Sequence, residues 1–267
     1  GERSAEAQIL LASATDLPLE AASVDAVITD PPYYDNVMYG ECSDYFYVWL
    51  KRSLRDMWPE FTAQPLSNKE TEAVANPALF RDVATHSGRG RRKEGTVTAG
   101  ELADRHYETL LTRSFREAHR VLKPDGVMTV MFTHKRVDAW DTLGQALLEA
   151  GFAIHSSWPV HTESEHSLHQ AKKNAAASTI LLTCRKRPTT EPAYWAEIRS
   201  DVERAAEDAA TNFAEQGIVG VDLTLATYGP VLSVLSQRWP VYTGELDGDG
   251  NPEVLRPDVA LDLAREA

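Results

Sequence analysis

A short segment at residues 30–33 carries the residue types best suited to chemistry. Asp30-Pro31-Pro32-Tyr33 directly follows the apolar run at 24–29, which has the length and composition of a buried strand. Two consecutive prolines restrict the backbone, so the loop presents a carboxylate, a rigid carbonyl and an aromatic face together. Ligands of open α/β sheets bind beyond the carboxyl ends of strands, so we predict a site here. The alternative is a simple strand-terminating turn, because Asp and Pro are common turn residues.

The composition predicts a soluble, cytoplasmic protein that makes no contact with a membrane. The chain has 267 residues, 43% hydrophobic and 25% charged, which is enough for one large or two small domains. Its only cysteines are Cys42 and Cys184, so no disulfide framework is expected. The sequence shows neither a signal peptide nor an apolar stretch long enough to cross a bilayer.

The net charge of −13 argues against a surface that is basic overall. A nucleic-acid enzyme of this charge needs a local basic patch or a partner. The best candidate is the glycine-containing loop at 86–93, in which Arg89, Arg91, Arg92 and Lys93 are placed to contact phosphates. A solvated surface loop is an equally good interpretation of this charge run.

The elements that must position the Asp30 loop follow from apolar periodicity and from punctuation. Two buried strands are predicted at 7–13 and 24–29, and then a helix that Ser43 caps. Residues 60–97 lack periodicity and are interpreted as a long insertion. Thr98 and Glu101 have the spacing of a capping box that opens a long helix. The remaining predicted elements are a strand at 127–133, a helix at 137–150 and strands at 152–158 and 178–184.

This alternation predicts an α/β fold with a Rossmann-like sheet whose last two strands form a hairpin edge. Residues 1–190 are predicted to form the catalytic region, and 191–267 a mainly helical extension. Within that extension, apolar spacing indicates helices at 193–216 and 228–238 that pack on the core.

Two segments have a superficial likeness to metal sites. Residues 244–252 contain Asp247-Gly248-Asp249-Gly250 but lack full calcium-ligand spacing, so we predict a hairpin or loop. His161, His166 and His169 lie close together without a supporting cysteine. A polar loop is the preferred interpretation of the histidines, and we predict no metal.

Asp-Pro-Pro-Tyr resembles the catalytic motif of the amino-methyltransferases, which methylate exocyclic amines of adenine or cytosine. The lone pair of such an amine is delocalised into the ring, so the enzyme must localise it. The resemblance implies that the amine donates one hydrogen bond to the Asp30 carboxylate and one to the Pro31 carbonyl. Such preorganised acceptors lower the barrier without a covalent intermediate. Tyr33 would stack on a base rotated out of its helix.

Further stretches extend the likeness over most of the chain. Together they resemble the large adenine-specific DNA methylases of the DUF1156 type, some of which are linked to phage defence. The stretches are Tyr33-Tyr34-Asp35-Asn36 with Tyr39, Ser43 to Arg52, Arg120-Val121-Leu122-Lys123-Pro124, Phe132-Thr133-His134-Lys135, Ser157 to Glu163, and Gly217 to Pro230.

The resemblance implies methyl transfer from S-adenosylmethionine to adenine N6 in DNA. Pro32 would belong to the catalytic motif, and Tyr34, Asn36 and Tyr39 would line the base pocket. Ser13, Asp16 and Asp30 would lie at the cofactor. Methylation of cytosine N4 or of an RNA base remains an alternative, and so does a noncatalytic module that binds nucleic acid or a protein partner.

The chain departs from the family in one respect. The glycine-rich turn that holds the methionine part of the cofactor is not visible, nor is the acid that binds the ribose hydroxyls. We therefore expect a carboxyl-terminal fragment, with the cofactor loop supplied by an upstream part of the same enzyme or by a second chain. Without its usual neighbours, the strand at 24–29 would expose an edge, which a homodimer could close.

Overall fold

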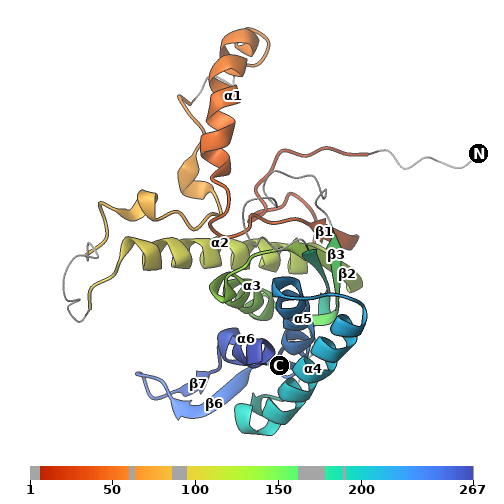
Figure 1. The fold of residues 1–267 in the computed structure, drawn as a ribbon. Coiled ribbons are helices and arrows are strands. Elements are labelled where there is room, and N and C mark those ends of the chain that lie inside the picture. Colours follow the sequence, from red (N-terminus) through yellow and green to blue (C-terminus); the bar gives the residue numbers. More distant parts are fainter. Residues whose placement is uncertain (1–6, 60–63, 86–94, 162–177, 189–190, 267) are drawn as a thin grey trace, which may run out of the picture.

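The computed structural model describes residues 7–59, 64–85, 95–161, 178–188 and 191–266. They form an α/β fold with two mixed sheets, and its arrangement is compatible with a Rossmann-like fold (Figure 1). The first half contributes β1 (Val24–Thr29), α1 (Tyr39–Leu54), η2 (Lys69–Thr71), η3 (Pro77–Phe80), α2 (Ala99–Val121), β2 (Leu122–Phe132) and α3 (Val137–Glu149). The second half contributes β3 (Phe152–His161), β4 (Ser178–Lys186), β5 (Ala193–Tyr194), α4 (Trp195–Glu215), α5 (Val221–Gln237), β6 (Val241–Leu246), β7 (Pro252–Val254) and α6 (Pro257–Glu266).

The main sheet has the strand order β1-β2-β4-β3. Strands β1 and β2 are parallel and are joined through α2, so their carboxyl ends meet at the same edge of the sheet. Strand β4 is antiparallel to both β2 and β3, which confirms the predicted hairpin edge. The Asp30 loop and the loop after β2 are therefore neighbours in space.

Helix α2 begins as the capping-box spacing predicts. The Thr98 hydroxyl accepts a hydrogen bond from the Glu101 backbone, and the Glu101 carboxylate accepts one from the Thr98 backbone. One face of the helix is buried, and it carries Ala103, Tyr107, Leu111, Phe115 and Ala118.

The carboxyl-terminal elements share a core with the sheet. Helix α5 packs against β3 and β4, and α4 and α6 pack on α5 (Figure 1). The predicted helix at 193–216 is confirmed, whereas the helix expected at 228–238 begins earlier, at Val221. Residues 244–252 lie across the β6–β7 hairpin, as expected, while α6 was not foreseen. Residues of the two predicted domains belong to one hydrophobic cluster.

The prediction of a buried strand at 7–13 is wrong. This segment makes only an isolated bridge between Ser13 and Asp16, and the Ile9 side chain is 97% exposed. A strand needs a neighbour for its backbone hydrogen bonds, and within the described residues β1 pairs only with β2. The outer side of β1 is correspondingly open, with Ile28 82% exposed.

Helix α1 also differs from the prediction. It begins at Tyr39, and Ser43 lies inside it, where the Ser43 hydroxyl donates to the Gly40 carbonyl instead of capping the amino end. No residue of α1 is buried, and its Trp49 side chain is 59% exposed. The helix projects away from the rest of the fold (Figure 1).

Candidate functional site

The Asp30 loop borders a cavity at the carboxyl end of β1. The cavity has a volume of about 430 Å³ and lies between the segment before β1, β1 itself and α2. Asp30 is exposed, whereas Pro31 is buried, and both line the cavity together with Pro32. Most of the wall is apolar and includes Val27, Leu111, Phe115 and Ala118.

The hydrogen-bond acceptors of the loop are used unequally. The Pro32 carbonyl accepts a hydrogen bond from the Tyr107 hydroxyl at 2.6 Å and one from the Tyr34 backbone at 3.1 Å. The Asp30 carboxylate accepts from the Tyr33 hydroxyl. The Pro31 carbonyl has no hydrogen-bond partner among the described residues. Asp30 and Pro31 thus retain acceptor capacity at the cavity, whereas the Pro32 carbonyl is anchored to α2 through Tyr107.

Tyr33 is half-buried at the edge of the core. Its ring meets Phe132 edge to face, with 5.3 Å between the ring centroids. Burial raises the pKa of the Tyr33 phenol, and the hydrogen bond to Asp30 adds to that rise. The phenol is therefore protonated at neutral pH and acts as a donor to Asp30.

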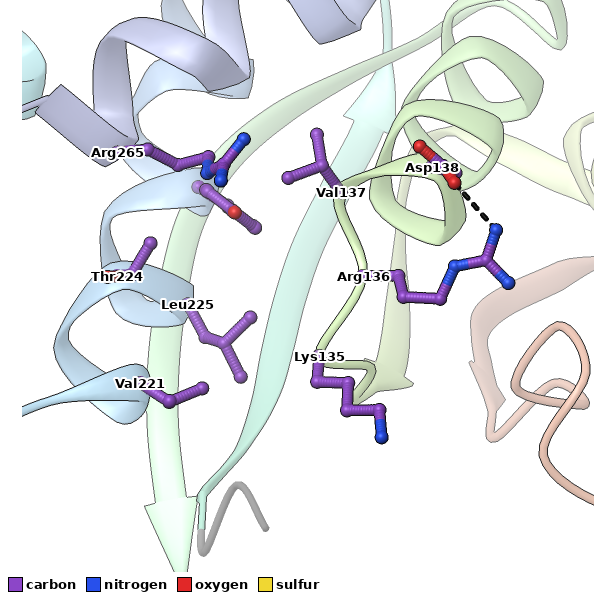
Figure 2. Close-up of a pocket in the computed structure, with 9 residues that line it drawn as sticks. Lys135, Arg136, Val137, Asp138, Val221, Thr224, Leu225 and Arg265 are labelled. Carbon is purple, nitrogen blue, oxygen red and sulfur yellow. Dashed lines mark hydrogen bonds and ion pairs between the residues drawn. The ribbon is translucent and has the colours of Figure 1, made fainter. Parts of the chain in front are cut away.

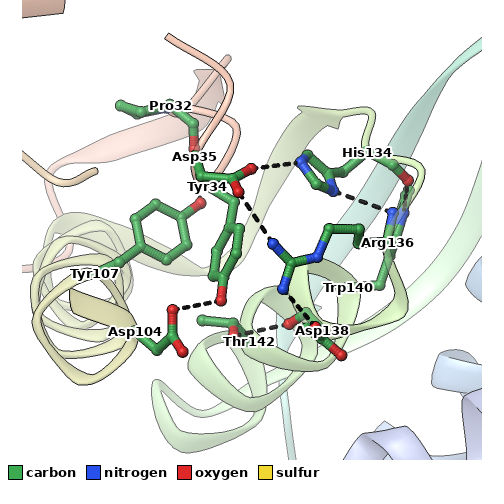
Figure 3. Close-up of polar contacts among 10 residues, drawn as sticks. All are labelled: Pro32, Tyr34, Asp35, Asp104, Tyr107, His134, Arg136, Asp138, Trp140 and Thr142. Atoms are coloured by element: carbon green, nitrogen blue, oxygen red, sulfur yellow. Dashed lines mark hydrogen bonds and ion pairs between the residues drawn. The ribbon is translucent and has the colours of Figure 1, made fainter. Parts of the chain in front are cut away.

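Tyr34 lies inside the core, although the resemblance placed it at the base pocket. Only 3% of it is exposed, and its backbone adopts a φ of 57°. Its hydroxyl donates to the Asp104 carboxylate at 2.5 Å, and its ring meets Tyr107 edge to face (Figure 3). Arg136 lies over the same ring. These contacts give Tyr34 the role of an anchor that fixes the loop on α2.

A polar network joins the loop to the end of β2. The Asp35 carboxylate accepts hydrogen bonds from His134 Nε2 and from the Arg136 guanidinium, each at 3.0 Å (Figure 3). The Arg136 backbone donates to His134 Nδ1, which leaves the proton of the neutral ring on Nε2. Burial lowers the pKa of His134 despite the opposing effect of Asp35. The ring is therefore neutral at pH 7. Its Nε2–H group donates the hydrogen bond that orients the Asp35 carboxylate.

Besides Asp30, two residues were predicted at the cofactor, and the structure places them differently. Ser13 lines the cavity, whereas Asp16 lies outside its wall, and the Asp16 backbone donates to the Ser13 carbonyl. The segment is held on α2 by Arg120, which donates to the Leu17 carbonyl and pairs with Glu117. Hydrogen bonds from Arg120 lower the pKa of Glu117 to about 2.

Two further residues predicted at the base pocket do not line the cavity. Asn36 is exposed, and Tyr39 is exposed at the first residue of α1. The four cations predicted to contact phosphates and two of the histidines considered as metal ligands lie outside the described residues. They are Arg89, Arg91, Arg92, Lys93, His166 and His169. No cluster of three metal-ligating side chains occurs in the part of the chain that the structure describes.

The sequence reasoning did not foresee the roles of Tyr107, Asp104, His134 and Arg136. Two signals were available. Tyr107 lies four residues after Ala103 and four before Leu111, on the apolar face of α2. His134 follows β2 as Asp30 follows β1, and the carboxyl ends of parallel neighbours meet.

No protein-family model and no curated protein matches this chain. Of the described helices, none has the length and apolar character needed to cross a lipid bilayer.

Proposed function

We propose that this chain carries the target-base half of an S-adenosylmethionine-dependent methyltransferase that acts on adenine N6 in DNA. The proposal depends mainly on one observation: the exposed Asp30 carboxylate lies beside the Pro31 carbonyl at a cavity beyond a strand end, and that carbonyl has no partner among the described residues. An exocyclic amine has two N–H donors, which match these two acceptors. The choice of adenine and of DNA comes from the resemblance of the motifs.

The chain's own residues would hold and orient the amine. Asp30 and Pro31 accept its two hydrogen bonds, which directs the nitrogen lone pair away from the ring. Tyr34 and Tyr107 hold the backbone between these acceptors and α2, so little reorganisation is needed on binding. Asp35, held by His134 and Arg136, fixes the far end of the loop.

The described residues fit S-adenosylmethionine only in part. When bound, the cofactor supplies a methyl group carried on a positively charged sulfur. The cavity of about 430 Å³ falls within the roughly 300–1,000 Å³ of ligand pockets, and its apolar wall suits a flat ring. However, none of its described lining residues is a glycine, and Asp16 lies outside its wall. We assign the missing part of the cofactor site to an upstream part of the same enzyme or to a second polypeptide that pairs with the open edge of β1.

Amine recognition can be tested without the cofactor. DNA oligonucleotides that contain adenine are compared with oligonucleotides that contain purine, which lacks the exocyclic amine. Wild-type chain should prefer adenine, and Asp30→Asn should reduce that preference because it replaces an ionised acceptor with an amide. Asp25→Asn is the matched control, since Asp25 lies on β1, pairs with Lys123 and does not line the cavity. Equal binding of adenine and purine by the wild-type chain would refute the proposal.

Product analysis distinguishes the alternative substrates. Unmethylated genomic DNA is incubated with the chain and S-adenosylmethionine, digested to nucleosides and analysed by mass spectrometry. N6-methyladenine supports the proposal, and N4-methylcytosine would move the target to cytosine. The noncatalytic alternative is favoured by the absence of a lining glycine. It predicts nucleic-acid binding that neither S-adenosylmethionine nor Asp30→Asn alters.

A further inference from the structure

A second cavity lies beside the carboxyl end of β2. Its volume is about 370 Å³, and its walls come from the loop after β2, the first turns of α5 and the end of α6. Figure 2 shows Lys135 and Arg136 on one side of this space and Thr224 and Arg265 on the other. The segments that form it are far apart in sequence, so the fold alone creates it.

Cations outnumber carboxylates in the wall of the cavity, although the whole chain is acidic. Three cations line it, Lys135, Arg136 and Arg265, against one lining carboxylate, Asp138, which pairs with Arg136. Two carboxylates outside the wall also pair with these cations, Asp35 with Arg136 and Asp262 with Arg265. The Lys135 ammonium has no partner within the described part of the chain, so it is the cation that remains for an anionic ligand.

The hydroxyl of a largely buried tyrosine in the wall lacks a hydrogen-bond partner among the described residues. Tyr228 is only 2% exposed and packs its ring against Trp140. It lines the cavity, and among the described residues its hydroxyl makes no hydrogen bond. Burial raises its pKa to about 12, with Arg265 opposing the rise. The phenol therefore remains a donor at the cavity, without an acceptor among the described residues.

Two helices begin at the same cavity. Val137 opens α3 and Val221 opens α5, and neither helix has a side-chain cap at its amino end. The free backbone N–H groups and the helix dipoles add partial positive charge there. Cations, an unpaired hydroxyl and two uncapped helix ends are all donors, and a tetrahedral oxyanion is their natural acceptor.

We propose that this cavity binds a backbone phosphate of the nucleic-acid strand that presents its base to Asp30. The assignment to nucleic acid rests on the proposed function, whereas the preference for a phosphate follows from the donors themselves. The two sites are physically linked, because Arg136 lines the cavity and also holds Asp35 of the base-binding loop. A phosphate here would fix the register of the strand, as backbone contacts do in protein–DNA complexes.

The test measures binding of a fluorescein-labelled DNA duplex by anisotropy over a range of salt concentrations. Lys135→Met removes one charge but keeps the aliphatic stem, so the slope of log K against log salt should fall by about 0.9. Tyr228→Phe keeps the packed ring and removes one hydrogen bond to a charged group, which should weaken binding about ten-fold. Arg204→Met is the control, because Arg204 is an exposed arginine of α4 that does not line the cavity.

Four results would overturn the inference. The first is unchanged duplex binding by both cavity variants, provided that their melting temperatures match the wild type. The second is an equal loss of duplex binding in Arg204→Met. The third is no binding of the duplex by the wild-type chain, and the fourth is binding of inorganic phosphate without binding of the duplex. Failure of the proposed function gives a different pattern. In that case adenine and purine bind equally, while Lys135→Met and Tyr228→Phe still weaken the duplex complex.

Discussion

Tyr107→Phe tests how the Asp30 loop is anchored. Tyr107 is fully buried on α2, and its hydroxyl donates to the Pro32 carbonyl at 2.6 Å. The substitution removes that bond but keeps the ring packed against Tyr34. The Pro32 carbonyl still accepts from the Tyr34 backbone, so it is not left unsatisfied. The expected loss is therefore the net value of one hydrogen bond, about 1 kcal/mol of unfolding free energy.

Differential scanning calorimetry measures this loss. For a chain of this size, about 1 kcal/mol corresponds to a fall of about 2–4 °C in melting temperature. Tyr47→Phe is the matched control, because the Tyr47 hydroxyl also donates to a backbone carbonyl, that of Gln64, but at the surface. It should change stability by less than about 0.5 kcal/mol. A Tyr107→Phe protein as stable as wild type, or an equal loss in Tyr47→Phe, would refute the reasoning.

Three further changes probe the surroundings of the site. Burial lowers the pKa of His134, so the unfolded chain takes up this proton first as the pH falls. The stabilisation of the folded state by the neutral His134 ring is present above the ordinary pKa of 6.5 and is lost as the pH falls below it. His134→Gln removes this titration, so it should flatten the decline in unfolding free energy between about pH 7 and 5. An unchanged decline would contradict this. Gly229→Ala should destabilise by about 1–3 kcal/mol in urea denaturation, because a Cβ would lie 2.1 Å from the Ser157 Cβ, while Gly248→Ala meets no atom within 4 Å and should be neutral. Equal stability of the two variants would argue against that contact. Arg120→Met removes the guanidinium that holds the segment before β1, so limited proteolysis should cut this segment faster than in wild type. The same cleavage rate would show that other contacts hold it.

The sequence predicted those elements whose signals are local. Thr98 and Glu101 cap α2 because a helix start needs partners for its free N–H groups within the same turn. Gly151 ends the α3 segment with a φ of 89°, a conformation that glycine adopts at little cost. The apolar run at 24–29 forms β1, and Asp30 and Pro31 follow it at the strand end, as predicted. The expected burial of this strand is wrong, because none of its residues is buried.

Predictions failed where an element depends on a neighbour. Residues 7–13 have a strand-like composition, but a strand is stable only with a paired edge, and this segment has none among the described residues. The apolar residues of α1 repeat at helical spacing, yet Trp49 and Phe46 are exposed because no described element packs on that face. Periodicity predicts the type of an element and does not supply its partner.

The sequence alone determined that a carboxylate and two prolines end a strand, because both the apolar run and the turn residues are local features. Only the tertiary structure decided what surrounds them. Parallel pairing of β1 with β2 brings His134 and Arg136 to Asp35, and α2 presents Tyr107 to Pro32 across 75 residues of chain. The second cavity joins the end of β2 to α5 and α6. Such contacts arise from packing between distant segments, which no local pattern of residues encodes.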